Sequence, residues 1–198
     1  MKENFQNLPN LPVIPNYALI EILPQNNSTA DRFMSINYSF AEVFFGKILI
    51  CSTSLGICYL AIVNDETASL SELQERFPGS LLINKTDEIQ QSALKFINCG
   101  KRASVKLHIK GTEFQLSVWN ELLNIPFGFL SSYGDIAKKI GRPGSSRAIG
   151  SAIGQNPVAY IIPCHRVIRK NGDIGGYRWG VPIKKKLIEC EISIKNNN

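Results

Sequence analysis

The sequence predicts an α+β fold, in which a small antiparallel-sheet region on the amino-terminal side precedes a mainly helical region. Residues 38–63 are rich in β-branched and aromatic residues, which favours strands. Beyond residue 110, apolar residues recur at helical spacing, and two short helical segments flank a Gly-containing turn, as in a helix-turn-helix. We therefore expect an extended arm (1–33), an amino-terminal α+β domain (34–110) and a helix-turn-helix domain (111–198).

The predicted arm and the sheet that follows it differ in composition. Four prolines interrupt the arm, which favours extended or loosely docked backbone over packed structure. Within residues 38–63, turn signals at Gly46-Lys47 and Leu55-Gly56 separate three apolar runs. These runs predict three adjacent strands of an antiparallel meander.

Two helices and a strand complete the predicted amino-terminal domain. Ser69, with Glu72 three residues on, has the pattern of a helix cap and predicts a short helix near residues 69–77. Apolar residues at helical spacing predict a second helix over residues 87–98. The strand after it alternates apolar and polar residues. His108 falls on the polar side, so we expect it at the surface.

The helix-turn-helix domain begins with a helix that Thr112 can cap and that ends at Ile125-Pro126. Ser132 precedes a short helix over residues 133–140. The turn G-R-P-G-S-S then leads into a second short helix over residues 147–154. Together these two short helices form the predicted helix-turn-helix.

The carboxy-terminal part combines an apolar run with an amphipathic helix. The run at residues 158–162 predicts a buried strand that leads to Cys164. Pro182 opens a last helix that continues through Ile192. On this helix we expect Lys184 and the two lysines after it to face mostly outward.

Composition and cysteine usage exclude several classes of protein. Hydrophobic residues make up 44% of the chain, yet no run reaches the roughly 20 apolar residues of a membrane span, and the first ten residues lack the apolar core of a secretory signal. The five cysteines contain no C-x-x-C pair, and the two histidines do not supply metal-ligand spacing. We therefore expect a cytoplasmic protein with no membrane segment, disulfide framework or metal site.

Charge is distributed unevenly along the chain. Residues 1–100 carry 6 basic and 10 acidic side chains, whereas residues 101–198 carry 16 basic and 6 acidic ones. Clustered Lys and Arg bind polyanions by releasing counterions from phosphates, although a solvated basic face has the same composition. Because the basic half coincides with the predicted helix-turn-helix, the two features together favour a nucleic-acid partner.

The stretch I-I-P-C-H-R-V-I places Cys164 directly before His165. A thiol attacks as its thiolate, so at neutral pH it needs a base, nearby positive charge or a helix amino terminus. On a regular strand the two neighbours would face opposite sides, so contact requires a change of direction at Pro163 or a bridging water. By itself the pair is also compatible with a buried structural cysteine, which is our interpretation of the other four cysteines.

Five segments carry a resemblance to a known family. I-P-C-H-R-V (162–167) follows R-A-I-G-S-A-I-G-Q-N-P (147–157), S-Y-G-D-I-A (132–137) and G-T-E-F-Q-L-S-V-W-N-E-L-L-N-I-P (111–126), and it precedes G-Y-R-W-G-V (176–181). In order and spacing they resemble the O6-alkylguanine-DNA alkyltransferases, also named methylated-DNA–protein-cysteine methyltransferases. The likeness is strong over residues 111–191 and weaker from about residue 38. The G-Y-R-W-G form is similar to that in the carboxy-terminal half of the bacterial Ada protein.

This resemblance implies a fold, an activity and a partner. The second domain would be a winged-helix/helix-turn-helix DNA-binding domain. The protein would repair DNA by moving an alkyl group, such as methyl, from O6 of guanine to its own Cys164, with O4 of thymine as a further candidate atom. The guanine would rotate out of the helix first, and each molecule would react once because the thioether formed is not readily hydrolysed. A monomer acting on double-stranded DNA that contains O6-alkylguanine, without metal or organic cofactor, is implied.

The resemblance also implies roles for single residues. Cys164 would accept the alkyl group, and His165 would act as its base through a water. Glu191 would polarise the imidazole, and Asn156 would brace the turn that presents the thiol. Tyr133 would donate a hydrogen bond or a proton to the departing guanine.

Further positions would bind the DNA and the flipped base. Arg147 would enter the base stack as the guanine rotates out. The DNA contacts would come from Tyr133 and from one helix, at Arg147, Ala148, Ser151, Ala152 and Gly154. The pocket for the base would include Val167, Tyr177 and Arg178.

Two alternatives remain open from the residues alone. One is a helix-turn-helix regulator or lesion binder in which Cys164 is structural. The other is a cysteine hydrolase that uses Cys164, His165 and Glu191, although the basic helix-turn-helix disfavours it.

Overall fold

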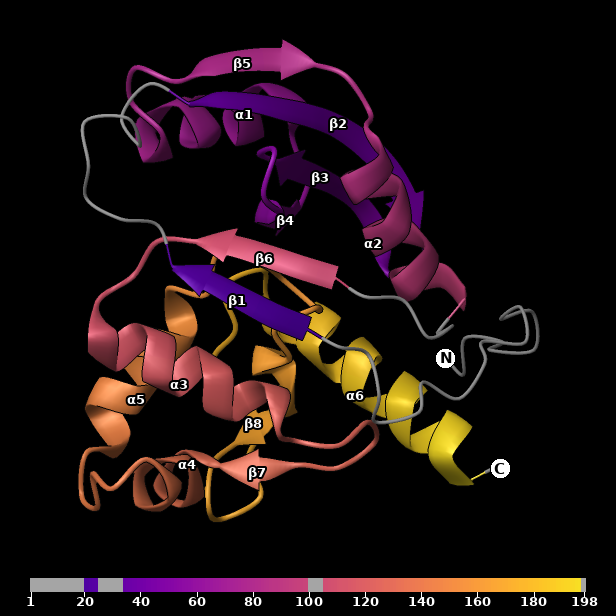
Figure 1. The fold of residues 1–198 in the computed structure, drawn as a ribbon. Helices are drawn as coiled ribbons and strands as arrows, with labels where there is room; N and C mark the ends of the chain where they lie inside the picture. The colour runs from indigo at the N-terminus through magenta and orange to yellow at the C-terminus, as the bar shows by residue number, and fades with distance from the viewer. Residues whose placement is uncertain (1–19, 25–33, 100–104, 197–198) are drawn as a thin grey trace.

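A mixed six-stranded sheet forms one part of the molecule, and helices gather against it (Figure 1). The computed structural model describes residues 20–24, 34–99 and 105–196. The strand order is β1-β6-β4-β3-β2-β5. The strands are β1 (Ile20–Pro24), β2 (Ser35–Val43), β3 (Gly46–Ser52), β4 (Ile57–Ile62), β5 (Leu81–Asn84) and β6 (Val105–Ile109). The α+β fold class is confirmed, but the sheet is mixed rather than wholly antiparallel.

The predicted meander is present. β2 pairs with β3 and β3 pairs with β4, both antiparallel. The first turn lies at Phe44-Phe45, two residues before the predicted signal, and Gly46 opens β3. Gly46 has a φ of 131°, a backbone conformation that residues with a Cβ rarely adopt. The glycine therefore marks the turn correctly, although it lies at the turn's end.

Two strands of the six-stranded sheet were not predicted from the sequence, and both pair in parallel. β1 lies within the predicted arm and pairs with β6, and β5 pairs with β2. The rest of the arm lies outside the described residues. Both strands are short and occupy the edges of the sheet, so their sequences need not alternate strongly. Their partners are distant in sequence, which is why no local pattern indicates them.

The first helix is correctly expected but wrongly capped. α1 (Glu66–Arg76) begins after Asp65, whose Oδ1 accepts a hydrogen bond from the Ala68 amide at 2.7 Å. Ser69 lies inside the helix, where its hydroxyl donates to the carbonyl of Asp65. Because Asp65 is the N-cap, Glu72 lies inside the helix rather than in its first turn. Its carboxylate therefore takes no part in capping.

The second helix agrees with the prediction, whereas the histidine after it does not. α2 (Glu88–Cys99) contacts β2, β3, β4 and β6. His108, expected at the surface, is buried, and its Nδ1 lies 2.8 Å from the Thr53 hydroxyl. Thr53 lies in the turn between β3 and β4. This turn covers the side of β6 that carries His108, which would be exposed in an isolated strand.

The carboxy-terminal half contains four helices among the described residues. Thr112 caps α3 (Glu113–Leu123) in a complete capping box with Gln115, and Ser132 caps α4 (Tyr133–Lys139). α5 (Ser146–Gly154) contacts both of them, as expected for a helix-turn-helix. α6 (Val181–Asn196) continues four residues beyond its predicted end.

The strand expected at residues 158–162 is absent. These residues form turns with a single bridge between Val158 and Leu60 of β4, and Tyr160 has a φ of 64°. A 3₁₀ helix, Cys164–Arg166, follows, and β8 (Val167–Ile168) then pairs with β7 (Ser131–Ser132). An apolar run of this length predicts burial but cannot distinguish a strand from a buried turn.

The apolar core extends from the sheet into the carboxy-terminal helices. Buried residues of β3, β4 and β6 belong to the same cluster as those of α3, α4, α5 and α6. A second, smaller cluster lies between the sheet and α1. No helix within the described ranges is long and apolar enough to cross a lipid bilayer. The continuous core fixes the carboxy-terminal helices relative to the sheet.

Candidate active site

A buried asparagine fixes the turn that carries Cys164. The Asn156 Nδ2 donates to the Ile162 carbonyl at 2.9 Å and to the Cys164 Sγ at 3.0 Å, and its Oδ1 accepts from the Val158 amide at 2.9 Å. One side chain therefore closes the turn and contacts the sulfur. Because Cys164 and His165 lie in a 3₁₀ helix, the alternation expected of a strand does not apply to them.

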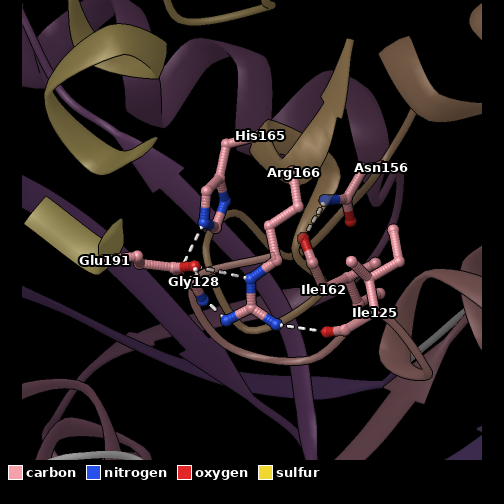
Figure 2. Close-up of polar contacts among 7 residues, drawn as sticks. All are labelled: Ile125, Gly128, Asn156, Ile162, His165, Arg166 and Glu191. Carbon is pink, nitrogen blue, oxygen red and sulfur yellow. Dashed lines mark hydrogen bonds and ion pairs between the residues drawn. The ribbon is translucent and has the colours of Figure 1, made fainter. Parts of the chain in front are cut away.

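The histidine is held from one side by a carboxylate (Figure 2). The His165 Nε2 lies 2.8 Å from Glu191 Oε1 on α6, and the imidazole stacks on the Tyr160 ring with an interplanar angle of 4°. His165 is fully buried, and its Nδ1 has no hydrogen-bond partner among the described residues. The contact with Glu191 through Nε2 leaves Nδ1 as the nitrogen that can take up a proton.

Glu191 is itself held by further donors, which Figure 2 shows converging on its carboxylate. Arg166 donates through Nε to Oε2 at 2.8 Å and through Nη2 to Oε1 at 2.9 Å, and the Gly128 amide donates to Oε2 at 3.0 Å. Arg166 also donates to the Ile125 carbonyl at 2.7 Å. Burial raises the pKa of Glu191, but His165 and Arg166 outweigh burial and lower that pKa to about 2. The carboxylate is therefore ionised at neutral pH.

The thiol and the imidazole are both neutral at rest. Burial raises the pKa of the Cys164 thiol, and the hydrogen bond from Asn156 and the charge of Lys184 only partly oppose this. Burial likewise lowers the pKa of His165, against the opposing effect of Glu191. The site therefore holds a protonated thiol near an imidazole that is free to accept a proton, rather than a preformed thiolate.

Lys184 lies inside the molecule, contrary to the prediction that it faces outward. Its Nζ donates to the carbonyls of Val167 at 2.7 Å, Ile174 at 2.6 Å and Gly176 at 3.2 Å, and burial lowers its pKa to about 8. The sequence did contain a signal. Lys184 precedes Leu187, Ile188 and Glu191 by three, four and seven residues, so all four lie on one face of α6.

The residues expected around the flipped base lie on three segments that meet near the thiol. β7 pairs with β8 so that Ser131 lies opposite the buried Val167, and Tyr133, the first residue of α4, follows β7 directly. The Tyr177 hydroxyl is buried, and burial and the neighbouring Cys164 thiol raise the pKa of Tyr177. Burial also raises the pKa of Tyr133. Arg178 is exposed, and its side chain forms an ion pair with Glu72.

The helix expected to contact DNA presents four of its five predicted positions to solvent. Arg147, Ala148, Ser151 and Gly154 are exposed on one face of α5. Ala152 is buried, and its carbonyl accepts a hydrogen bond from the Trp119 indole at 2.8 Å. α3 packs against the face of α5 on which Ala152 lies, so Ala152 is the one predicted position on this helix that is not at the surface.

Three contributions to the site were not predicted from the sequence. They are the Arg166 guanidinium on Glu191, the Gly128 amide on the same carboxylate, and the lysine that holds the carbonyls of the loop after Val167. The position of Arg166, two residues after Cys164, indicated positive charge near the thiol but not its partner. A backbone amide such as that of Gly128 leaves no signal in the sequence.

Comparisons with known proteins agree on one family. Residues 113–193 match the family model described as 6-O-methylguanine DNA methyltransferase, DNA binding domain. The inducible methylated-DNA–protein-cysteine methyltransferase of Bacillus subtilis is 44% identical over 72% of this chain and 82% of its own length. The bifunctional transcriptional activator/DNA repair enzyme Ada of Escherichia coli is 37% identical over 80% of this chain, which spans 46% of Ada.

A solved structure agrees with these relatives. Mycobacterium tuberculosis OGT in complex with DNA superposes with a TM-score of 0.66 at 30% identity, over 80% of this chain and 94% of that one. The match therefore includes the sheet as well as the helices of the carboxy-terminal half.

Proposed function

The chain belongs to the methylated-DNA–protein-cysteine methyltransferase family, and on this premise we propose that Cys164 is the residue that accepts the alkyl group. The activity is DNA repair by direct transfer of an alkyl group to the protein. The observation that carries the assignment is the arrangement around the sulfur. Asn156 fixes the thiol at 3.0 Å, and the next residue, His165, is hydrogen-bonded to a carboxylate at 2.8 Å.

The transfer is a displacement at carbon. The thiol proton of Cys164 passes, through one water, to Nδ1 of His165. The sulfur then forms a bond to the alkyl carbon as the bond from that carbon to O6 of guanine breaks, and the electron pair remains with the base. Guanine gains one proton, so the net change moves the thiol proton to guanine and the alkyl group to sulfur. The thioether has no ready hydrolysis, and each molecule reacts once.

The charges around the imidazole suit this transient proton. His165 becomes an imidazolium only while the sulfur attacks, and the ionised Glu191 lies 2.8 Å from its Nε2. The neutral resting state avoids a buried thiolate, which burial makes unfavourable. Tyr133 hydrogen-bonds to the departing guanine, whose charge it helps to disperse.

DNA is the partner, and we propose double-stranded DNA containing O6-alkylguanine as the substrate. The guanine must leave the stack to reach the sulfur, and unstacking costs a few kcal/mol. Arg147, exposed in the first turn of α5, fills the vacated space and offsets part of that cost. The small exposed residues Ala148, Ser151 and Gly154 let the α5 backbone approach the groove closely.

We also propose that the protein acts as a monomer in the cytoplasm. The four described cysteines, Cys51, Cys58, Cys164 and Cys190, are all free. Free thiols suit a reducing compartment, and such a compartment would keep the acceptor available.

Mass spectrometry after a single incubation tests the proposal. With an excess of duplex DNA containing O6-methylguanine, the intact protein should gain one methyl group, located on the peptide that contains Cys164. Cys164→Ala should abolish the gain and leave DNA affinity largely unchanged, whereas Cys190→Ala should still be methylated. Repeated turnover, or methylation on another residue, would contradict the assignment. Loss of DNA affinity together with transfer in Cys164→Ala would favour a structural cysteine.

A further inference from the structure

The segment between β8 and α6 covers the acceptor thiol. Cys164 is only 2% exposed, and the buried hydroxyl of Tyr177 lies beside its sulfur. From the inside, Lys184 holds the carbonyls of Ile174 and Gly176. Because so little of Cys164 is exposed, the position of this segment controls how easily an alkylated purine reaches the sulfur.

The same segment is also held from the outside, by a helix of the amino-terminal half. The Arg178 guanidinium forms an ion pair with Glu72 of α1, 106 residues away in the sequence, and lies 5.6 Å from the centre of the Trp179 ring. Arg178 directly follows Tyr177, so this pair fixes the chain next to the residue that covers the thiol.

Glu72 is anchored within the sheet region. The hydroxyl of Tyr59, on β4, donates to Oε1 of Glu72 at 2.8 Å, and this is the oxygen that Arg178 contacts. Tyr59 is buried in the smaller core cluster, and the Arg76 guanidinium lies 5.4 Å from its ring centre. Because Tyr59 is fixed by packing, it restricts the positions that Glu72 can adopt, and Arg178 is thereby tied to the sheet.

We propose, on the basis of the function above, that Glu72 is a positioning residue that sets the access of alkylated bases to Cys164. By holding Arg178 it keeps residues 177–179 close to the thiol and opposes their outward movement. A large alkyl group needs a wider opening than a methyl group. The Glu72–Arg178 pair therefore favours small alkyl groups over large ones.

The expected size of the effect follows from the exposure of the pair. The Glu72 side chain is 45% exposed and that of Arg178 27%, and an ion pair of this kind contributes modestly because solvent screens it. Breaking it should increase the open fraction of the segment by about two- to fivefold. This range is measurable as a ratio of rates.

The test measures single-turnover alkylation of Cys164 by the free bases O6-methylguanine and O6-benzylguanine, so that DNA charges play no part. Glu72→Gln should react about two- to fivefold faster with the benzyl compound and less than twofold faster with the methyl compound. Tyr59→Phe should give a smaller change in the same direction. Glu75→Gln removes the same charge from an exposed position of α1, and its rates should equal those of the wild type.

Reversal of the pair separates this role from a general loss of packing. The double variant Glu72→Arg with Arg178→Glu should restore a benzyl-to-methyl ratio near that of the wild type, whereas each single reversal should raise the ratio. Labelling of Cys164 by a bulky maleimide should follow the same order and does not depend on alkyl transfer. Thermal unfolding of each variant shows whether the fold is retained.

The outcomes distinguish the two proposals. If the wild type shows no alkylation of Cys164 by methylated DNA or by either base, the proposed function fails. If the wild type reacts but Glu72→Gln has an unchanged benzyl-to-methyl ratio and an unchanged maleimide rate, the positioning role of Glu72 is overturned and the proposed function remains.

Discussion

At the scale of single residues, the chemistry of the site depends on where protons reside. Cys164 and His165 are both buried in their neutral forms, and Glu191 stays ionised between His165 and Arg166. The arrangement differs from a thiolate–imidazolium pair, in which the nucleophile is charged before the substrate arrives. Here the substrate should trigger the proton transfer, because charge appears on sulfur only as carbon approaches.

This distribution of protons predicts the pH dependence of alkylation. Burial lowers the pKa of His165 from 6.5, so the imidazole stays neutral as the pH falls to about 6.5. The alkylation rate should therefore stay constant over that range. Below that value the rate should decrease as His165 becomes protonated. Single-turnover rates with free O6-methylguanine between about pH 5 and pH 8.5 provide the measurement. A tenfold rise in rate per pH unit across the neutral range would instead indicate attack by a preformed thiolate.

The carboxylate of Glu191 predicts both a rate effect and a stability effect. Glu191→Gln should slow alkylation by about 10²-fold or more, because the imidazolium loses its counter-charge. It should also destabilise the fold by about 3–5 kcal/mol, because Arg166 is left largely buried without its partner. Single-turnover kinetics and urea unfolding measure the two effects. Glu189→Gln, an exposed change two residues away, is the matched control and should alter neither.

The stability of the wild type should depend on Glu191 in a definite pH window. The pKa of Glu191 is lowered from 4.5 to about 2, so its contribution is complete above pH 4.5 and is lost as the pH falls toward 2. Urea unfolding at several pH values should show a steeper acid loss in the wild type than in Glu191→Gln. Parallel curves for the two proteins would mean that another carboxylate is responsible.

At the scale of elements, α6 links the active-site loop to the imidazole partner. Lys184 and Glu191 lie two turns apart on one face of the helix, and one holds the loop after β8 while the other holds His165. A single helix therefore helps to position both the loop after β8 and the imidazole of His165.

Removal of the buried amine should loosen this loop. Lys184→Met keeps the length and the apolar stem of the side chain but removes the amine. The carbonyls of Val167, Ile174 and Gly176 then lose their hydrogen-bond donor. We expect a loss of about 1–3 kcal/mol in the free energy of unfolding and slower alkylation. Urea unfolding and single-turnover kinetics test this. Lys185→Met changes the next, exposed lysine, and a similar loss there would argue against a specific role for Lys184.

The exposed face of α5 predicts a substrate-dependent defect. The Arg147→Ala variant should transfer the alkyl group from duplex DNA about tenfold more slowly, because no side chain fills the space that the guanine leaves in the base stack. With the free base its rate should equal that of the wild type. Comparison of the two substrates in single-turnover assays gives the measurement. Lys95→Ala removes one exposed charge from α2 and serves as the control. Equal slowing of Arg147→Ala with both substrates would exclude a role in the base stack.

At the scale of the whole molecule, charge and core are distributed differently. The basic excess lies in residues 101–198, whereas the apolar core runs from the sheet into the helices of that same half. Core contacts from the sheet therefore hold the helices in place, while most of the basic side chains follow residue 100. Through Glu72 and Arg178 it also reaches the segment that covers the thiol.

This asymmetry predicts that DNA affinity depends strongly on salt. Contacts from Lys and Arg to phosphates release counterions, so the logarithm of the association constant should fall linearly with the logarithm of salt concentration. Fluorescence anisotropy with unmodified duplex between about 50 and 200 mM salt measures the slope. Arg147→Ala should reduce the steepness by about one unit at most, and Lys95→Ala should leave it unchanged. A salt-independent affinity would show that the basic half does not contact phosphates.

Local patterns in the sequence were enough to predict the structural features that depend on neighbouring residues. The Thr112 helix cap, the helices α3 to α6 and the meander of β2 to β4 follow from local patterns, and the structure confirms them. The order of short motifs around Cys164 likewise indicated the family without any contact being known. In each case the information lies within a few residues of chain, or in identities that the sequence displays directly.

Contacts between groups that are distant in the sequence became known from the three-dimensional fold. It placed Lys184 inside rather than outside, buried His108, turned the expected strand before Cys164 into a buried turn, and joined Glu72 to Arg178. The physical reason is common to these cases. Burial and hydrogen bonding between residues many positions apart depend on how the elements pack, and neither periodicity nor local propensity contains that arrangement.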